Sequence, residues 1–283
     1  MFDANHPDVD RAVRFALEED IGAGDVTTRS CVPEGTRARG SFWAREPMVV
    51  AGVELLPLIY RLRGGVDSLN LEVKSGDRVP AGTRIARVEG LAWTLLECER
   101  VSLNFMQRLS GVATLASRYW DQVKHTKCRV LDTRKTTPGL RILEKMAVAA
   151  GGATNHRIGL HDAILIKNNH ISAAGGVAAA LRHAFAQTSG TGLPVEIEVR
   201  TRAELEEALA NGAQRLLLDN LTPAEAAEWI QHVNGRASCE LSGGITLETV
   251  RAYAEAGADF VSCGAMTHSA TAVDLNFRLE LRP

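Results

Sequence analysis

The sequence lacks the features that define several protein classes. It has only five cysteines, widely scattered and without CxxC spacing, so neither a disulfide framework nor a zinc site is indicated. No run approaches about 18 apolar residues without a charge, which argues against a transmembrane helix. The first residues are acidic and have none of the basic and apolar regions of a signal peptide. These absences predict a cytoplasmic protein with reduced thiols and no membrane partner.

A strong imbalance of charge is also missing. Lys and Arg number 32 against 34 Asp and Glu, and aromatic residues make up only 5% of the chain. Without a basic stripe interleaved with aromatics, no nucleic-acid partner is expected. The fingerprints GxGxxG and GxxxxGK[ST] are absent, which excludes the common dinucleotide and P-loop sites. What is present is a hydrophobic content of 45%, enough for a substantial core in a chain of 283 residues.

The first 110 residues mix helical and strand patterns. Apolar side chains recur at helical spacing in three segments, and alternation marks short strands with a turn at 75–77. Gly111 lies inside the longest helical segment, where it predicts a break or bend and a domain boundary. The predicted elements are helices at 7–20, 53–62 and 91–123, and strands within 37–45 and 68–90.

From about residue 127 the pattern becomes strand, loop and helix, repeated at a spacing of roughly 20–35 residues. Such βα units imply parallel strands joined by crossovers, and six of them favour a barrel or partial barrel over an open sheet. The predicted strands are CRVLDT, AILIKN, VEIEV, RLLLDN, SCELSG and DFVSCG. The predicted helices are 172–187, 202–211, 223–233 and 246–256.

Polar residues follow each of these strands at the same end. Active sites of barrels form at the carboxyl ends of the strands, so these residues are candidates for one site. Ordinary loop chemistry explains one or two of them but not six in register. The candidates are Asp132–Lys135, Lys167–His170, Glu198, Asp219–Asn220, Ser242–Gly244 and Cys263–Gly264.

Residues 132–170 concentrate positive charge in a chain whose net charge is -2. Clustered cations suit a small, multiply charged anion, since Arg offers a rigid fork to carboxylate or phosphate. The alternative is a solvated helical face, which fits Arg141, Glu144 and Lys145 because they have helical spacing. A solvated face fits less well for Arg134, Lys135 and Lys167, which end strand-like runs. The cations are Arg134, Lys135, Arg141, Lys145, His156, Arg157 and Lys167.

Two further motifs complement the cations. Ser242-Gly243-Gly244-Ile245-Thr246 closes a strand and is expected to open a helix, an arrangement that suits phosphate, and Gly264 could complete the cradle. Glu198 and Asp219 end adjacent strands, where carboxylates beside a phosphate suggest Mg²⁺. A general base, or ion pairs with neighbouring cations, are the open alternatives.

Long motifs distributed over nearly the whole chain resemble quinolinate phosphoribosyltransferases. They are EEDIGAGDVTT, ERVSLNFMQRLSG, DTRKTTPGLR, GGATNHRIGLHDAILIKNNH, VEIEV, LLLDN, SGGI and SCGAMTHS. The resemblance implies the α/β class, with an α+β N-terminal open-faced sandwich domain and the incomplete α/β barrel of type II phosphoribosyltransferases. The implied domains are 1–112, with 272–283 packing back on it, and 113–271. A homodimer, or a larger oligomer built from it, is also implied.

The resemblance further implies that quinolinate and phosphoribosyl pyrophosphate yield nicotinate mononucleotide, pyrophosphate and CO₂, a step of NAD biosynthesis. Lys135, Glu198 and Asp219 would be catalytic, and the two acids would hold Mg²⁺ largely through phosphoribosyl pyrophosphate. The implied quinolinate ligands are Arg134, His156, Arg157 and Lys167, with Arg100 arriving from the partner subunit. The implied phosphate ligands are Lys135, Ser242, Gly243, Gly264 and His268.

One position departs from the family, which usually reads Lys-Asp-Asn-His or Lys-Glu-Asn-His where this chain has Lys167-Asn168-Asn169-His170. Asn168 therefore carries no charged or acid-base role. Rival interpretations are nicotinate phosphoribosyltransferase, which takes a mono-acid, a molybdenum-associated paralogue, and a non-catalytic anion-binding barrel. The three cations Arg134, Arg157 and Lys167 favour a dicarboxylate over a mono-acid.

Overall fold

The structure is a computed structural model that describes residues 3–281. It divides into two compact units, which are described separately. The first comprises residues 1–117, 136–152 and 266–283, and the second comprises 118–135 and 153–265. Residues 1–2 and 282–283 lie outside the described part. The domain limits expected from the sequence, 1–112 with 272–283 and 113–271, stay a prediction.

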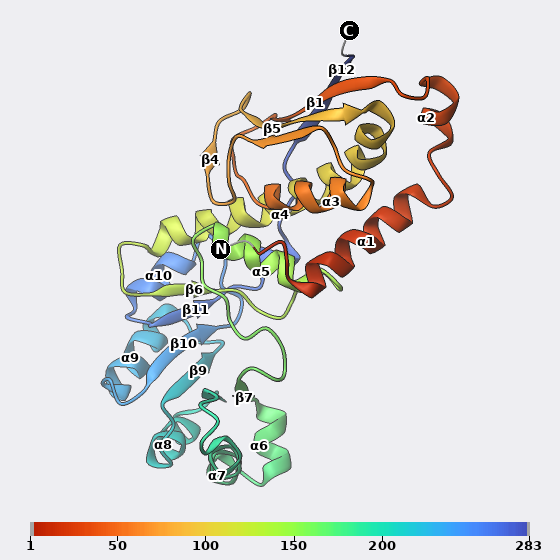
Figure 1. The fold of residues 1–283 in the computed structure, drawn as a ribbon. Coiled ribbons are helices and arrows are strands. Elements are labelled where there is room, and N and C mark those ends of the chain that lie inside the picture. Colours follow the sequence, from red (N-terminus) through yellow and green to blue (C-terminus); the bar gives the residue numbers. More distant parts are fainter. Residues whose placement is uncertain (1–2, 282–283) are drawn as a thin grey trace. The chain divides into compact units, whose positions relative to one another are not determined.

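The first unit is built on a four-stranded antiparallel sheet (Figure 1). Its strand order is β12-β1-β5-β3, with bounds Leu275–Leu281, Arg37–Ala44, Arg84–Leu91 and Ser68–Leu71. Burial alternates along β1, so one face carries core residues such as Phe42. The other face carries charge, for example the Arg39–Glu89 pair at 2.6 Å. One apolar and one polar face are the features of an open-faced sandwich.

Helices and short strands complete the first unit. The helix α1 ends where Gly22 adopts φ 52°, close to the end that the sequence predicts at residue 20. The elements are α1 (Pro7–Ile21), α2 (Val26–Cys31), β2 (Met48–Val49), the 3₁₀ helix η1 (Val53–Leu55), α3 (Leu56–Leu62), β4 (Arg78–Val79), α4 (Ala92–Val123), α5 (Arg141–Ala150) and α11 (Ala265–His268). The last residues of α4, from 118 on, belong to the second unit. Longest of these is α4, with 32 residues. Within residues 3–281, no helix is both long and apolar enough to cross a membrane.

The predicted break at Gly111 is wrong, because α4 runs through this position without interruption. Glycine is needed there for close packing. A Cβ at residue 111 would lie 2.1 Å from the carbonyl oxygen of Thr271 and 3.1 Å from Cα of Ala272. Gly151 at the end of α5 behaves similarly, since its Cβ would lie 2.4 Å from the carbonyl oxygen of Ala113. Gly111 on α4 and Gly151 at the end of α5 therefore let two other segments approach the α4 backbone.

We expect Gly111→Ala to destabilise the protein by about 1–3 kcal/mol, because the added methyl overpacks against backbone that cannot move away. Helix propensity alone predicts the opposite sign, a gain of roughly 1 kcal/mol. Chemical denaturation measures the change, and Arg118→Ala, exposed on the same helix, serves as the control. A stabilised Gly111→Ala variant would contradict the packing argument.

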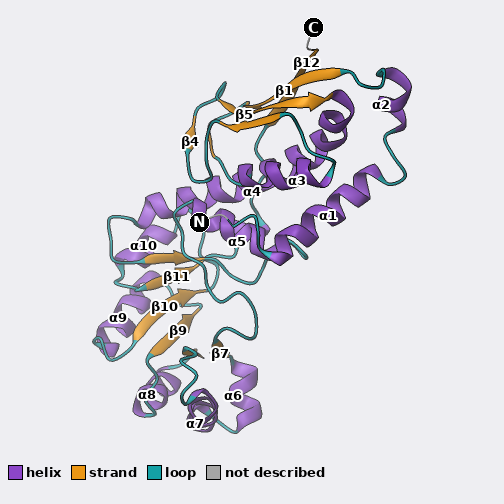
Figure 2. Ribbon diagram, in the orientation of Figure 1, coloured by secondary structure: helices purple, strands orange, loops and turns teal. Residues whose placement is uncertain are grey.

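The second unit is built on a six-stranded parallel sheet with the order β6-β11-β10-β9-β8-β7 (Figure 2). All six predicted strands are confirmed. Their bounds are β6 (Arg129–Leu131), β7 (Ile164–Ile166), β8 (Val195–Val199), β9 (Arg215–Asp219), β10 (Ser238–Ser242) and β11 (Phe260–Ser262). In the described part of the chain no pairing joins the edge strands β6 and β7, so the barrel is incomplete. The parallel strands and the incomplete closure agree with the predicted α/β fold class.

Five helices connect these strands: α6 (Asn168–Ala174), α7 (Val177–Thr188), α8 (Arg202–Ala210), α9 (Pro223–Val233) and α10 (Val250–Glu255). The single helix predicted at 172–187 is wrong, because Gly175 and Gly176 adopt φ 87° and 128° and separate α6 from α7. The helix predicted to open at Thr246 begins only at Val250. No helix N-terminus therefore follows Gly243-Gly244 directly.

Candidate active site

The carboxyl ends of β8, β9 and β10 bring the predicted acidic and glycine-rich residues to one edge of the sheet. The register pairs Asp219 with Ser242 and places Glu198 opposite Leu217. Parallel strands have this consequence because all of their carboxyl ends point the same way. The site therefore begins with groups from three neighbouring strands.

Glu198 and Asp219 form an acidic pair that is already in contact with a cation. The Glu198 side chain is 7% exposed and the Asp219 side chain 15%. Nη2 of Arg200 lies 2.7 Å from Oε1 of Glu198 and 3.7 Å from Oδ2 of Asp219. The Glu198 Oε1 nevertheless accepts no hydrogen bond of good geometry from the described residues. The pair thus attracts positive charge, and Oε1 of Glu198 can still act as a ligand for a cation.

Asn220 and Gly243 fix the turn beside this pair. Asn220 adopts φ 60°, and its backbone N–H donates to the carbonyl of Ser242 at 2.9 Å. Its side-chain amide donates to Oδ2 of Asp219 at 2.7 Å. Gly243 has φ 101°, and a Cβ there would lie 2.3 Å from Oδ1 of Asn220. Only glycine fits at 243, whereas nothing lies within 4 Å of a Cβ at Gly244, where the site is open.

The predicted cations occupy the loops that follow β6 and flank β7. Arg134, Lys135 and Lys167 are exposed, and Arg157 is half-buried. Burial, and then the charge of Arg134, lower the pKa of the Arg157 guanidinium. Two guanidinium groups that repel each other are stabilised by an anion between them. Lys167 precedes α6, and its N–H donates to Nδ1 of His170 at 2.9 Å.

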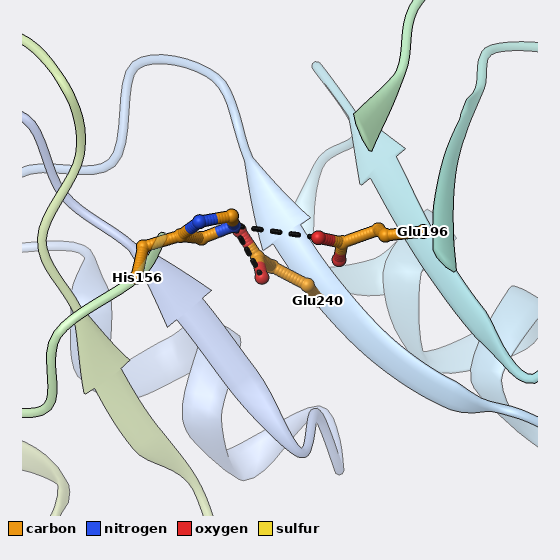
Figure 3. A group of neighbouring side chains, drawn as sticks. All are labelled: His156, Glu196 and Glu240. Atoms are coloured by element: carbon orange, nitrogen blue, oxygen red, sulfur yellow. Dashed lines mark ion pairs between the residues drawn. The ribbon is translucent and has the colours of Figure 1, made fainter. Parts of the chain in front are cut away.

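His156 enters a buried ionic cluster inside the sheet (Figure 3). Its Nε2 lies 3.3 Å from a carboxylate oxygen of Glu196 on β8 and 3.4 Å from one of Glu240 on β10. The guanidinium of Arg215 lies 3.2 Å from Glu196 and 3.1 Å from Glu240. It also stacks 4.5 Å from the ring centroid of Phe260. Two carboxylates, a guanidinium and an imidazole therefore share one site.

Acidic neighbours favour protonation at the His156 site. Burial opposes charge on the imidazole, but hydrogen bonds to Glu196 and Glu240 outweigh it and raise the pKa of His156 to about 9. Burial also raises the pKa of Glu196. The N–H of Arg157 points at Nδ1 of His156 at 2.7 Å, which requires a lone pair on that nitrogen. The proton that these neighbours favour is therefore shared among His156, Glu196 and Glu240 rather than held on Nδ1.

A second buried network lies in the first unit. The Glu144 side chain is fully buried and accepts hydrogen bonds from Nε and Nη2 of Arg108 at 3.0 and 2.7 Å. It also accepts from the backbone N–H and hydroxyl of Thr137 at 3.0 and 2.7 Å. Arg108 donates further to the carbonyls of Thr267 and Ala270. Glu144 is thus an internal anchor rather than part of a solvated helical face.

The remaining predicted residues are distributed over both units. Arg100 is exposed on α4 in the first unit, as is His268, whose Nδ1 lies 2.6 Å from the Ser269 hydroxyl. Gly264 follows β11 in the second unit. Asn168 is the first residue of α6. The assignment of Arg100, Lys135, Gly264 and His268 to substrates stays a prediction.

Sequence reasoning overlooked Arg200, Arg215 and Glu240. A weak indication exists for Glu240, a carboxylate between the apolar residues Cys239 and Leu241 of the strand SCELS. Arg200 directly follows VEIEV, and Arg215 begins RLLLD, positions at which an exposed charge is ordinary. The partners of Arg215 and Glu240 lie on other segments, so spacing along the chain could not identify these two residues. Arg200 lies only two residues from Glu198, but its contact with Asp219 depends on the neighbouring strand.

Comparison with known proteins supplies the family. The family model "Quinolinate phosphoribosyl transferase, C-terminal domain" matches residues 112–278, and the corresponding N-terminal domain model matches 25–110. A nicotinate-nucleotide pyrophosphorylase [carboxylating] of Mycobacterium leprae is 41% identical over 94% of this chain and 95% of its own length. A mitochondrial quinolinate phosphoribosyltransferase [decarboxylating] of Nicotiana tabacum is 39% identical over 97% of this chain and 84% of its own.

Structural similarity leads to the same family. NadC from Streptococcus pyogenes superposes with a TM-score of 0.94 and 36% sequence identity, covering 100% of both chains. The two family models together cover nearly the whole sequence, including every strand and helix that contributes to the candidate site. This chain belongs to the quinolinate phosphoribosyl transferase family.

Proposed function

We propose that this chain transfers the phosphoribosyl group of phosphoribosyl pyrophosphate to quinolinate and removes one carboxylate, producing nicotinate mononucleotide, pyrophosphate and CO₂. It is a decarboxylating transferase of NAD biosynthesis. The observation that carries this proposal is the similarity, near 40% identity over almost the whole chain, to relatives named for this reaction.

The quinolinate carboxylates are bound by Arg134, Arg157 and Lys167. A dicarboxylate brings two negative charges, which suits two neighbouring guanidiniums better than one charge would. Lys135 follows Arg134 directly and contacts phosphate. The 5-phosphate lies against the backbone of Ser242, Gly243 and Gly264. The open space at Gly244 supports this placement.

In the transfer step, the pyridine nitrogen attacks the anomeric carbon of ribose while the bond to pyrophosphate breaks. The carboxylates of Glu198 and Asp219 stabilise the positive charge that develops on ribose. After transfer the ring nitrogen is cationic. Its positive charge therefore stabilises the electron pair that stays on the adjacent ring carbon when the bond to the carboxylate breaks and CO₂ leaves, and a proton then adds to that carbon. No organic cofactor is required.

Mg²⁺ fits the acidic pair. Glu198 and Asp219 offer oxygen ligands at the ends of adjacent strands, and the buried Glu198 Oε1 has unused accepting capacity. When bound with phosphoribosyl pyrophosphate, Mg²⁺ would neutralise the leaving pyrophosphate. Arg200 contacts both carboxylates but its side chain is 47% exposed, so it can turn into solvent when the ion binds. Glu198 and Asp219 would hold the ion together with substrate oxygens.

We expect Glu198→Gln to lower kcat/KM for phosphoribosyl pyrophosphate roughly ten- to a hundredfold and to raise the Mg²⁺ concentration that gives half the maximal rate. The substitution preserves the shape of the side chain but removes the charge that attracts the ion. Steady-state kinetics at varied Mg²⁺ measure both effects. Glu206→Gln on the exposed side of α8 is the matched control. An unaltered Mg²⁺ requirement would argue against this ligand set.

A second copy of the chain completes the active site, with Arg100 of the partner subunit reaching quinolinate. Two features of the first unit support a homodimer. Arg100 is exposed on α4, and the next turn of that helix, with Val101, Asn104 and Phe105, lines a cavity of about 820 Å³. Phe15 on α1 borders the same cavity and is 67% exposed. A large exposed aromatic beside an apolar cavity is typical of a protein–protein contact.

The reaction is tested with quinolinate labelled in the 2-carboxylate. Purified protein, Mg²⁺ and phosphoribosyl pyrophosphate should release labelled CO₂, and omission of phosphoribosyl pyrophosphate should stop the release. A parallel reaction with nicotinate should form no nicotinate mononucleotide. Product from nicotinate together with silence from quinolinate would transfer the assignment to the mono-acid enzyme.

A further inference from the structure

Residues 154–157 are held against β6 by a series of hydrogen bonds. Thr154 N–H donates to the carbonyl of Val130 at 2.8 Å, and the N–H of Asp132 donates to the carbonyl of Thr154 at 3.1 Å. The N–H of His156 donates to Oδ1 of Asp132 at 2.8 Å, and Asp132 is completely buried. The backbone at His156 therefore has a fixed position relative to the sheet.

Both ring nitrogens of His156 are engaged inside the protein. Nε2 faces the carboxylates of Glu196 and Glu240, and Nδ1 accepts the N–H of Arg157 at 2.7 Å (Figure 3). With its proton on Nε2, the ring donates toward the carboxylates and keeps the Nδ1 lone pair that the Arg157 N–H requires. A substrate could bind a ring nitrogen only by displacing one of these partners. The arrangement suits a link between two parts of the protein better than a ligand for quinolinate.

A metal site is the competing explanation, since one ligand atom from each of His156, Glu196 and Glu240 lies within 4.8 Å of the others. Arg215 argues against it. Its guanidinium is 3.2 Å from Glu196 and 3.1 Å from Glu240, so the negative charge that would attract a metal is already offset. A cation added beside this guanidinium would be repelled.

The linked residue, Arg157, is fixed at both ends. Its N–H is directed by His156, and its Nη1 donates to the carbonyl of Ala163 at 3.1 Å, directly before β7. Asp162 accepts the next two backbone N–H groups, those of Ile158 and Gly159, at 2.7 and 2.9 Å. A guanidinium held in this way loses less conformational entropy when it binds an anion.

We propose that His156 is a positioning residue, which connects the buried Glu196–Glu240 pair to the backbone of Arg157 and so directs the Arg157 guanidinium toward a substrate carboxylate. Glu196, Glu240 and Arg215 thereby acquire a role in substrate affinity without contacting the substrate. This inference rests on the proposed function, in which Arg157 binds quinolinate. It differs from the sequence-based expectation that His156 is itself a quinolinate ligand.

A double-mutant cycle on His156 and Arg157 tests the proposal. We expect His156→Ala to raise KM for quinolinate about tenfold or more, with KM for phosphoribosyl pyrophosphate unchanged. In the Arg157→Ala background the same substitution should have no further effect, because the group that it positions is gone. An equal loss in both backgrounds would overturn the proposal, since His156 would then contact quinolinate independently.

Glu240→Gln provides a second test that leaves His156 in place and preserves side-chain shape. It should raise KM for quinolinate in the wild-type background but not in the Arg157→Ala background. His125→Ala, which removes a histidine paired with Glu255 at the surface, should leave both KM values unchanged. Uptake of one Zn²⁺ per wild-type chain that is lost in Glu240→Gln would overturn the proposal in favour of a metal site. If the wild-type protein releases no CO₂, the proposed function fails first, and the two failures are thereby distinguished.

Discussion

Arg157→Ala is expected to abolish most quinolinate turnover while leaving the fold intact. Loss of one member of a buried charge pair costs about 2–5 kcal/mol, or from roughly thirtyfold to several thousandfold in kcat/KM. The loss should be largest for quinolinate, because Arg157 lies beside Arg134 in the region assigned to the dicarboxylate. Steady-state kinetics with each substrate varied in turn provide the measurement. Wild-type kinetics in this variant would refute the assignment of the site.

Two controls separate this effect from general damage. Arg182→Ala, which removes an exposed arginine of α7, should retain normal kinetics. Circular dichroism should superpose for both variants and the wild type. Mixing Arg157→Ala with Arg100→Ala also tests the dimer. If Arg100 serves the partner's site, mixed dimers contain one site with both arginines, and activity should return well above that of either variant alone.

The strands could be predicted from the sequence because each is a short apolar run that ends in polar residues. VEIEV coincides with β8, and the helix predicted at 223–233 coincides with α9, whose N-terminus is marked by Thr222 and Pro223. Parallel pairing then followed from the repeated βα pattern, and it placed Glu198, Asp219 and Ser242 at one edge. Local sequence is sufficient to predict a structural element and its site residues where both belong to one continuous segment.

The structure at glycine positions was predicted less successfully, because glycine occurs both inside a continuous helix and at the end of a helix. At Gly111 it permits close approach of Thr271, which lies far away in the sequence, and the helix continues. At Gly175 and Gly176 it adopts positive φ and ends a helix. The two cases look alike in a sequence with a continuing apolar pattern. The distinction depends on what packs against the backbone.

The ionic cluster was beyond sequence reasoning for a similar reason. His156, Glu196, Arg215 and Glu240 come from four separate segments, and only the sheet order brings them together. The expectation that His156 contacts quinolinate came from resemblance and from its place beside Arg157. The structure shows that both ring nitrogens of His156 already have partners inside the protein. This observation replaces the expected role as a quinolinate ligand by that of a positioning residue.

Glu144→Ala should cause the largest loss of stability, about 3–5 kcal/mol, because it removes one partner of a buried ion pair. The Arg108 guanidinium, 25% exposed, would lose its counter-charge, and the hydroxyl and N–H of Thr137 would lose their acceptor. Glu144→Gln retains an acceptor oxygen without the charge and should fall between Glu144→Ala and the wild type. Chemical denaturation followed by tryptophan fluorescence and circular dichroism measures the series.

Burial, rather than the ion pair as such, is the physical reason for this expected loss, and a surface pair provides the contrast. Asp10 and Arg14 on α1 form an ion pair at 2.7 Å with side chains 40% and 55% exposed. Asp10→Ala should therefore change stability by less than about 1 kcal/mol, since water replaces the lost partner. Equal losses for Asp10→Ala and Glu144→Ala would show that burial does not set the energy of these pairs. A loss confined to Glu144 would establish the Arg108–Glu144–Thr137 network as the anchor of the segment that follows Lys135.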